Sequence, residues 1–138
     1  MAFFSAYTDS MLEPLRLRVV DALSSETSAT LSTNGPGGIQ AGFFPCESDG
    51  LTLYLLVPAS SDVLYNLETE TAVIITTPHW QMEGEAGACV QAQTLPAVRL
   101  AHSPQAPGCV LAAIRCRRIH FNWMEGWGYR ETIDCDDG

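Results

Sequence analysis

The sequence predicts a mainly antiparallel β domain with helices added (α+β). Short β-branched and apolar runs recur from residue 28 onward, Gly- and Pro-rich turns separate them, and helical spacing is confined to two segments. Successive strands with short connections close into a barrel or form a sandwich. A length of 138 residues with a hydrophobic fraction of 46% is that of one domain, so we take residues 1–138 as one unit.

The first expected element is a helix over about residues 10–25. Ser10 and Glu13 have capping-box spacing, and Pro14 suits the first turn of a helix that begins slightly later. Its apolar stripe is formed by Leu12, Leu15, Val19 and Leu23. The helix is expected to end at Ser24–Ser25.

The β-structure is expected over about residues 28–135. It opens with strands over Ser28–Thr33, Ile39–Pro45 and Leu51–Val57, joined by turns at Asn34–Gly38 and Glu47–Gly50. Pro58–Ser61 then interrupts the third strand, and its serines suit the start of a short helix. The apolar positions of that helix are Val63, Leu64 and Leu67.

Most residues of Thr71–Thr77 are β-branched, which makes this segment the strongest strand signal. The later expected elements are a strand over about Gln81–Thr94, a loop over Pro96–Gly108, a long strand over Cys109–Phe121, a turn at Glu125–Gly128 and a short strand over Arg130–Cys135. In the first of these strands, Gly84, Ala86, Gly87 and Ala88 predict tight packing or a bulge.

The net charge of −9 excludes two classes of partner. All seven basic residues are arginines, against 16 acids, so the chain would repel a nucleic-acid backbone and an anionic membrane surface. No apolar run is long enough to cross a bilayer, and the first ten residues lack the pattern of a signal peptide. A cytoplasmic location is therefore expected.

The cysteines and histidines give no metal or disulfide signature. The five cysteines are odd in number and form no CxxC pair, which predicts buried or half-buried apolar side chains. His79, His102 and His120 do not have metal-site spacing, although Cys116 and His120 would share one face of a regular strand. No metal site is predicted.

The order of these elements resembles the FMN-binding split β-barrel family of the pyridoxamine 5'-phosphate oxidase type. ATLSTNGPGGIQAGFF resembles its opening hairpin, and LYLLVPASSDVLYNLETETAVIITT resembles its third strand, serine-containing phosphate loop, short helix and fourth strand. Trp80 with Gly84 and Ala86 resembles the start of its fifth strand, and GWGYRETID resembles the C-terminal segment of some short members. The resemblance spans Ser28–Asp134 and rests on the ordered combination. It implies a six-stranded antiparallel split barrel and a homodimer.

The resemblance also implies a flavoprotein that binds FMN and acts as an oxidoreductase on a small molecule. The flavin would supply the redox chemistry, so no catalytic side chain is assigned. The implied cofactor-binding residues are Gln40, Ala41, Gly42, Phe43, Phe44, Pro45, Val57, Ser60, Ser61 and Trp127. Contacts along Gln40–Pro45 are expected to come mostly from backbone groups, and phosphate contacts from Val57, Ser60 and Ser61.

The chain departs from the family at the positions whose basic side chains hold the phosphate. Gln40, Pro45, Asp62 and Val63 occupy those positions, whereas a phosphate monoester prefers charged donors. Two alternatives therefore stay open. One is a degenerate barrel that binds haem, a deazaflavin or a small metabolite. The other is a dimeric structural or interaction protein without a ligand.

Three further groups of residues have competing interpretations. Ser60–Asp62 suits a phosphate site and an ordinary helix N-terminus equally. The only basic cluster consists of Arg115, Arg117 and Arg118. On a regular strand, Arg118 would lie on the opposite face from the other two. We favour surface ion pairs over phosphate contacts for these arginines. Trp80, Trp123 and Trp127 are candidates to shield a flavin ring; we favour packing for Trp123 and leave Trp127 open.

Overall fold

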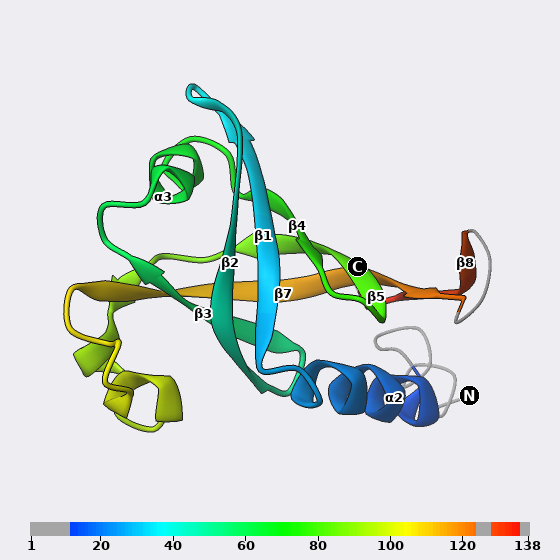
Figure 1. Ribbon diagram of the computed structural model, residues 1–138. Coiled ribbons are helices and arrows are strands. Elements are labelled where there is room, and N and C mark those ends of the chain that lie inside the picture. Colours follow the sequence, from blue (N-terminus) through cyan, green and yellow to red (C-terminus); the bar gives the residue numbers. More distant parts are fainter. Residues whose placement is uncertain (1–11, 124–127, 136–138) are drawn as a thin grey trace, which may run out of the picture.

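The computed structural model describes residues 12–123 and 128–135 (Figure 1). Its helices are α2 (Glu13–Ser24), α3 (Asp62–Leu67) and the short 3-10 helices η1 (Ala92–Thr94) and η2 (Arg99–His102). Its strands are β1 (Ser28–Gly35), β2 (Gly38–Asp49), β3 (Thr52–Pro58), β4 (Ala72–Thr76), β5 (Trp80–Ala86), β6 (Val90–Gln91), β7 (Cys109–Asn122) and β8 (Tyr129–Asp134).

The strands form a closed antiparallel barrel, as the sequence predicts. Hydrogen-bonded neighbours follow the order β3-β2-β1-β4-β5-β7, and β7 pairs back with β3 to close six strands. β6 and β8 are additional strands that pair with β7. Closure leaves the six barrel strands without an open sheet edge along most of their length.

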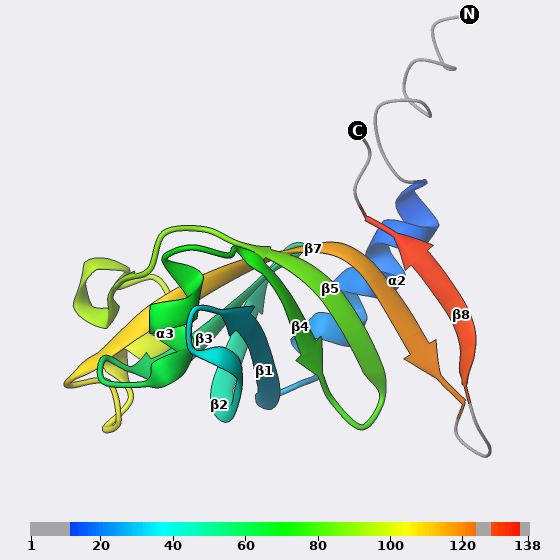
Figure 2. The same ribbon diagram turned by 90° about the horizontal axis from the view of Figure 1, so that it is seen from above.

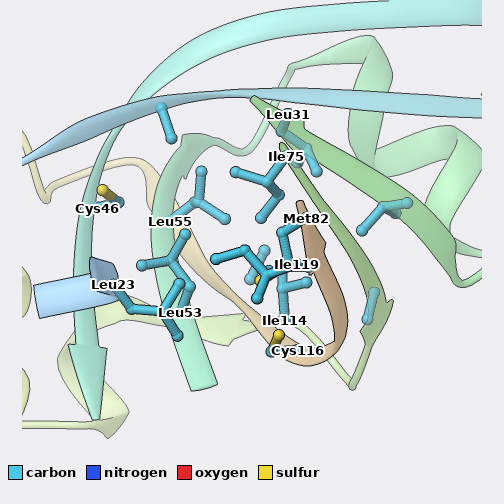
Figure 3. Close-up of a cluster of buried hydrophobic side chains, with 14 of the residues drawn as sticks. Leu23, Leu31, Cys46, Leu53, Leu55, Ile75, Met82, Ile114, Cys116 and Ile119 are labelled. Carbon is cyan, nitrogen blue, oxygen red and sulfur yellow. The ribbon is translucent and has the colours of Figure 1, made fainter. Parts of the chain in front are cut away.

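One face of each strand supplies the core. Leu31, Leu55, Ile75, Met82 and Ile114 are fully buried and point toward one another (Figure 3). α2 adds Val19 and Leu23 to the same core, and Figure 2 shows it crossing beneath the end of the barrel that carries β8.

The sequence predicted α2 well where the helix is described. Pro14 lies in its first turn, and the helix ends at Ser24, where the N–H of Ser25 donates to the carbonyl oxygen of Asp21. Ser10, the expected capping residue, lies outside the described residues. Leu12 is exposed, so the apolar stripe contributes to the core from Leu15 onward.

The barrel is split between β2 and β3. These strands pair only where Cys46–Asp49 faces Thr52–Leu55, and beyond that point α3 packs against β1 and β2 (Figure 1). The predicted turn at Glu47–Gly50 is wrong, because β2 continues to Asp49 and the chain reverses at Gly50. The φ of Gly50 is +60°, a left-handed conformation that favours glycine.

The strand predicted over Gln81–Thr94 is interrupted. β5 ends at Ala86, and after residues 87–89 the chain forms only the two-residue β6 and η1. The tight packing predicted at Gly84 is confirmed, because a Cβ there would lie 2.4 Å from Cγ2 of Ile114. The predicted bulge is confirmed as well, since the β5–β7 register shifts between Glu83 and Gly84.

That register shift places an extra residue, Arg117, on β7. Cys116 and Ile119 both point into the core, so Arg117 and Arg118 are both exposed. Two predictions made from regular alternation are therefore wrong. Arg115, Arg117 and Arg118 are all exposed, and Cys116 and His120 do not share a face.

Four of the cysteines are buried, as expected, whereas Cys89 is exposed, which corrects the prediction for that residue. The Sγ atoms of Cys116 and Cys135 lie 2.8 Å apart and share a hydrogen bond. This hydrogen bond, together with burial, raises the pKa of Cys116, so the first thiolate of the pair would form on Cys135.

A second apolar cluster covers the outer side of β3 and β7. Leu56 and Leu111 pack there against Ala92, Val98 and Ala106 from the segment between β6 and β7. The Glu47 carboxylate fixes this segment by accepting hydrogen bonds from the backbone N–H groups of Arg99 and Leu100, each at 3.1 Å. No helix within the described ranges is long and apolar enough to cross a membrane.

Candidate functional site

The residues predicted to follow a cofactor, Gln40–Pro45, all lie on β2 with alternating orientations. Ala41 and Phe43 are exposed on the outer face, whereas Phe44 points into the core. A Cβ at Gly42 would lie 2.3 Å from Cζ of Phe44, so the phenyl ring packs closely against this glycine. The side chains of Ala41 and Phe43 are therefore accessible to a ligand, and that of Phe44 is not.

The remaining two residues of this stretch are partly exposed. The Gln40 side chain donates to the carbonyl oxygen of Gly37 over 3.0 Å, and Pro45 is half-buried opposite Ser28 of β1. Within the described chain, residues 39–45 of β2 pair with β1 alone. The backbone edge that faces β3 thus has no strand partner there, so its N–H and C=O groups are open to a ligand.

Val57, Ser60 and Ser61 lie where the chain leaves β3 for α3. Val57 is fully buried and pairs with Val110 of β7, so its side chain is inaccessible. Ser60 is exposed and Ser61 is half-buried, and neither hydroxyl forms a hydrogen bond with any described residue. The turn itself is closed by the N–H of Ser61, which donates to the carbonyl oxygen of Pro58 over 2.9 Å.

This geometry bears on the two interpretations of Ser60–Asp62. Ser61 occupies the N-cap position of α3, yet its hydroxyl makes no capping hydrogen bond, and Asp62 is exposed in the first turn. The serines do not perform the capping that an ordinary helix N-terminus would give them. Both hydroxyls are available to a ligand.

Asn66 is a residue of this site that sequence reasoning missed. Its side chain is fully buried and accepts a hydrogen bond from the N–H of Gly37 at 3.1 Å. Its amide N–H groups donate to Oγ1 of Thr33 at 3.0 Å and to the carbonyl oxygen of Gly38 at 2.9 Å. Asn66 therefore fixes α3 against the β1–β2 hairpin. The only sequence signal was the Asn-Leu pair at the end of the expected short helix.

The positions expected to hold a phosphate provide no positive charge. Val63 is buried in the core, Asp62 is acidic and exposed, and Gln40 and Pro45 are uncharged. All seven arginines lie on α2, η2, β7 or β8: Arg16, Arg18, Arg99, Arg115, Arg117, Arg118 and Arg130. Toward FMN, this part of the chain therefore offers neutral hydroxyl and backbone donors.

The basic cluster on β7 forms surface ion pairs, as favoured from the sequence. Arg117 lies 3.5 Å from Glu85, and Arg118 lies 3.5 Å from Asp134. His120 is held nearby, with Nε2 2.7 Å from the Glu83 carboxylate. No group of three metal-ligating side chains occurs in the part of the chain that the structure describes.

The tryptophans are not gathered at this site. Trp80 is buried in the barrel core, where it cannot cover a flavin ring on the outer face. Trp123 is 53% exposed, so the packing role favoured for it is not found within this chain. Trp127 lies outside the described residues.

The fold is shared with several solved structures. No protein-family model and no curated protein matches the sequence. A protein related to general stress protein 26, of the pyridoxinephosphate oxidase family, from Clostridium acetobutylicum has a TM-score of 0.63 at 12% identity, over 92% of this chain and 99% of that one. An F420 reductase has a TM-score of 0.58 at 15% identity, over 72% of this chain and 94% of that one.

A haem-binding protein from Mycobacterium smegmatis gives a TM-score of 0.62 at 17% identity, over 88% of this chain and 57% of that one. Identities this low show a common fold rather than a common ligand. This chain accordingly has the split-barrel fold of the pyridoxamine 5'-phosphate oxidase-like proteins.

Proposed function

We propose that this chain is a homodimeric flavin-binding split barrel that holds FMN at the gap between β2 and β3 and serves as an oxidoreductase for a small molecule. One observation carries the proposal. The unpaired backbone edge of β2 and the free hydroxyls of Ser60 and Ser61 flank the same gap, and Asn66 holds α3 in place beside it. Such a rigid site binds a ligand at a lower entropic cost.

The residues present suit the flat ring of a flavin better than its phosphate. Ala41 is small and exposed and lets a planar ring approach the outer face of β2, while Ser60 and Ser61 supply neutral donors to a phosphate. Bound FMN would supply the redox chemistry, and the chain would bind and orient it. Without a charged donor nearby, we expect modest affinity for the phosphate.

The outer face of β2 supports the homodimer. Ile39 is 79% exposed and Phe43 is 71% exposed, with Ala41 between them on the same face. Large apolar side chains gathered on one face of a sheet are typical of an interface. A two-fold interface there would bring two equivalent sites together.

A second candidate is a barrel that binds a less anionic ligand, such as a deazaflavin, haem or a small metabolite, in the same gap. The exposed Asp62 carboxylate next to Ser61 favours it, because a phosphate at the serines would meet a like charge.

Absorption spectroscopy separates these candidates. The purified chain is measured before and after incubation with FMN and desalting, and FMN affinity is compared with that of riboflavin, which lacks the phosphate. FMN retained more tightly than riboflavin supports the proposal, equal affinities contradict the phosphate placement, and a Soret band favours haem.

Two variants locate the phosphate. Ser60→Ala with Ser61→Ala should weaken FMN binding, whereas the matched pair Ser24→Ala with Ser25→Ala at the end of α2 should not. Asp62→Lys should tighten binding, because it replaces a repelling charge with an attracting one. Weaker FMN binding by Asp62→Lys would show that the phosphate lies elsewhere.

A further inference from the structure

A cleft of about 540 Å³ opens far from α3, where the end of α2 meets the β4–β5 turn and the adjoining ends of β7 and β8. α3 and β8 lie toward opposite ends of β7 (Figures 1 and 2). No residue that lines the cleft belongs to the proposed FMN site at the gap between β2 and β3. Its volume is in the range of small-molecule sites.

Three large aromatic side chains line this cleft. Trp80, Phe121 and Trp123 line it, together with Pro78 and Ala22. Trp80 is only 1% exposed, and its Nε1–H has no hydrogen-bond partner among the described residues. A buried N–H without a partner is costly, since it has given up water. A ligand with an acceptor oxygen in this cleft would compensate that cost.

The charge available in the cleft is positive. The guanidinium of Arg130 lies over the Phe121 ring, 5.6 Å from its centroid. It forms no ion pair with a carboxylate of the described ranges, although its charge contributes, after Arg18, to lowering the pKa of Glu131. Arg18 also lies over this ring, but it pairs with Glu131. Among the described residues that line the cleft, Glu26 is the one acid, and its carboxylate lies 3.0 Å from Nδ1 of His79.

We propose that this cleft binds a small planar aromatic carboxylate. The ring would lie among the aromatic walls, the carboxylate would pair with the fork-shaped donor group of Arg130, and an oxygen would accept a hydrogen bond from Nε1 of Trp80. A single arginine in a chain of net charge −9 suits one carboxylate rather than a phosphate.

The probe is benzoate, titrated into the full ¹⁵N-labelled chain while the indole N–H signals are followed by NMR. Trp80 is assigned as the signal lost in Trp80→Phe, or by elimination with Trp123→Phe and Trp127→Phe if that variant does not fold. We expect a saturable downfield shift of the Trp80 signal. Neutral benzamide and non-aromatic cyclohexanecarboxylate should bind more weakly.

Arg130→Gln should lower benzoate affinity by about tenfold, the effect of removing a charge-assisted hydrogen bond. The control is Arg99→Gln on η2, whose side chain is 90% exposed and does not line this cleft. The absence of a saturable shift, or equal affinity in the Arg130 and Arg99 variants, would overturn the proposal. Neither result depends on FMN binding, so this test and the flavin test fail separately.

Discussion

Asn66 connects two parts of the molecule that the chain order separates. It lies on α3, yet each of its three side-chain hydrogen bonds reaches the β1–β2 hairpin. Gly35 belongs to the same contact, because a Cβ there would lie 2.9 Å from Oδ1 of Asn66. The position of α3 beside the proposed flavin site therefore depends on one amide group and on a glycine that leaves room for it.

Replacing Asn66 by alanine should lower the free energy of unfolding by about 2–4 kcal/mol, because three hydrogen bonds that hold α3 on the hairpin would be lost, one of them to the buried Thr33 hydroxyl. Urea denaturation measures the change. The control is Asn34→Ala on the same hairpin, where the side chain is exposed and a small effect is expected. Similar losses in both variants would contradict this role for Asn66.

Cys46 gives the molecule a dependence on alkaline pH. Burial, followed by the nearby Glu26 carboxylate, raises the pKa of Cys46 from 9.0 to about 12. Its thiol stays neutral in the folded chain at a pH where the unfolded chain has already ionised. The contribution of Cys46 to stability is thus complete below pH 9 and is lost as the pH rises toward about 12.

Over that interval, the free energy of unfolding should fall by about 1.4 kcal/mol per pH unit through this group. Urea denaturation of the wild type and of Cys46→Ala, repeated at increasing pH, measures the difference. The variant should show a flatter pH dependence. Parallel curves would mean that Cys46 does not titrate as described.

Elements with a strong local pattern could be predicted from the sequence, while those set by tertiary contacts could not. The repeat of Leu15, Val19 and Leu23 indicated α2, and the apolar run that begins at Cys109 indicated β7. The extra residue Arg117 was invisible, because a bulge depends on the partner strand rather than on the strand that contains it. The turn residues of Glu47–Gly50 likewise obscured three strand positions, because β2 continues to Asp49.

In the candidate site, too, the features set by a local sequence pattern could be predicted and those set by tertiary contacts could not. Gln40–Pro45 was placed on one strand, and alternation on that strand is regular. No pattern in the sequence indicated that β2 pairs with β3 only from Cys46 to Asp49, nor that Trp80 would leave its indole N–H unpaired beside a cleft. Both features arise from packing between elements distant along the chain.

The β5–β7 pair depends on the absence of a side chain at Gly84. Gly84→Ala should lower the free energy of unfolding by about 1–3 kcal/mol, since the new methyl group would meet Ile114 and the carbonyl oxygen of Arg115. The matched control is Gly87→Ala, whose nearest contact would be an ordinary 3.7 Å. Thermal unfolding compares them, and an equal fall in Tm for both would refute this account of Gly84.

At the scale of the whole molecule, charge and apolar surface act in opposite senses. A net charge of −9 favours separate, soluble chains, whereas the exposed apolar side chains of β2 favour association. Because no charged side chain lies between Ile39 and Phe43 on that face, the apolar contribution is concentrated there.

In the proposed dimer, Phe43→Asp should shift the chain toward the monomer in sedimentation equilibrium, because a two-fold interface would bury two new carboxylates. Leu17→Asp on α2 is the control, since that leucine is 55% exposed but lies on another face. A monomeric wild type would rule out the dimer, and dissociation by Leu17→Asp alone would place the interface on α2.

The extra residue at Arg117 has a consequence for comparing this chain with its relatives. Inward positions on β7 are even-numbered up to Cys116 and odd-numbered from Ile119, so the strand changes phase once along its length. If an alignment with a relative is shifted by one residue at this point, the inward positions of one chain are matched with the outward positions of the other over the rest of the strand. Arg117 is thus a reference point for insertions and deletions: a relative that lacks this residue has to be aligned with a gap here, because an alignment without a gap would set its inward apolar residues against Arg118 and His120 instead of Ile119 and Phe121.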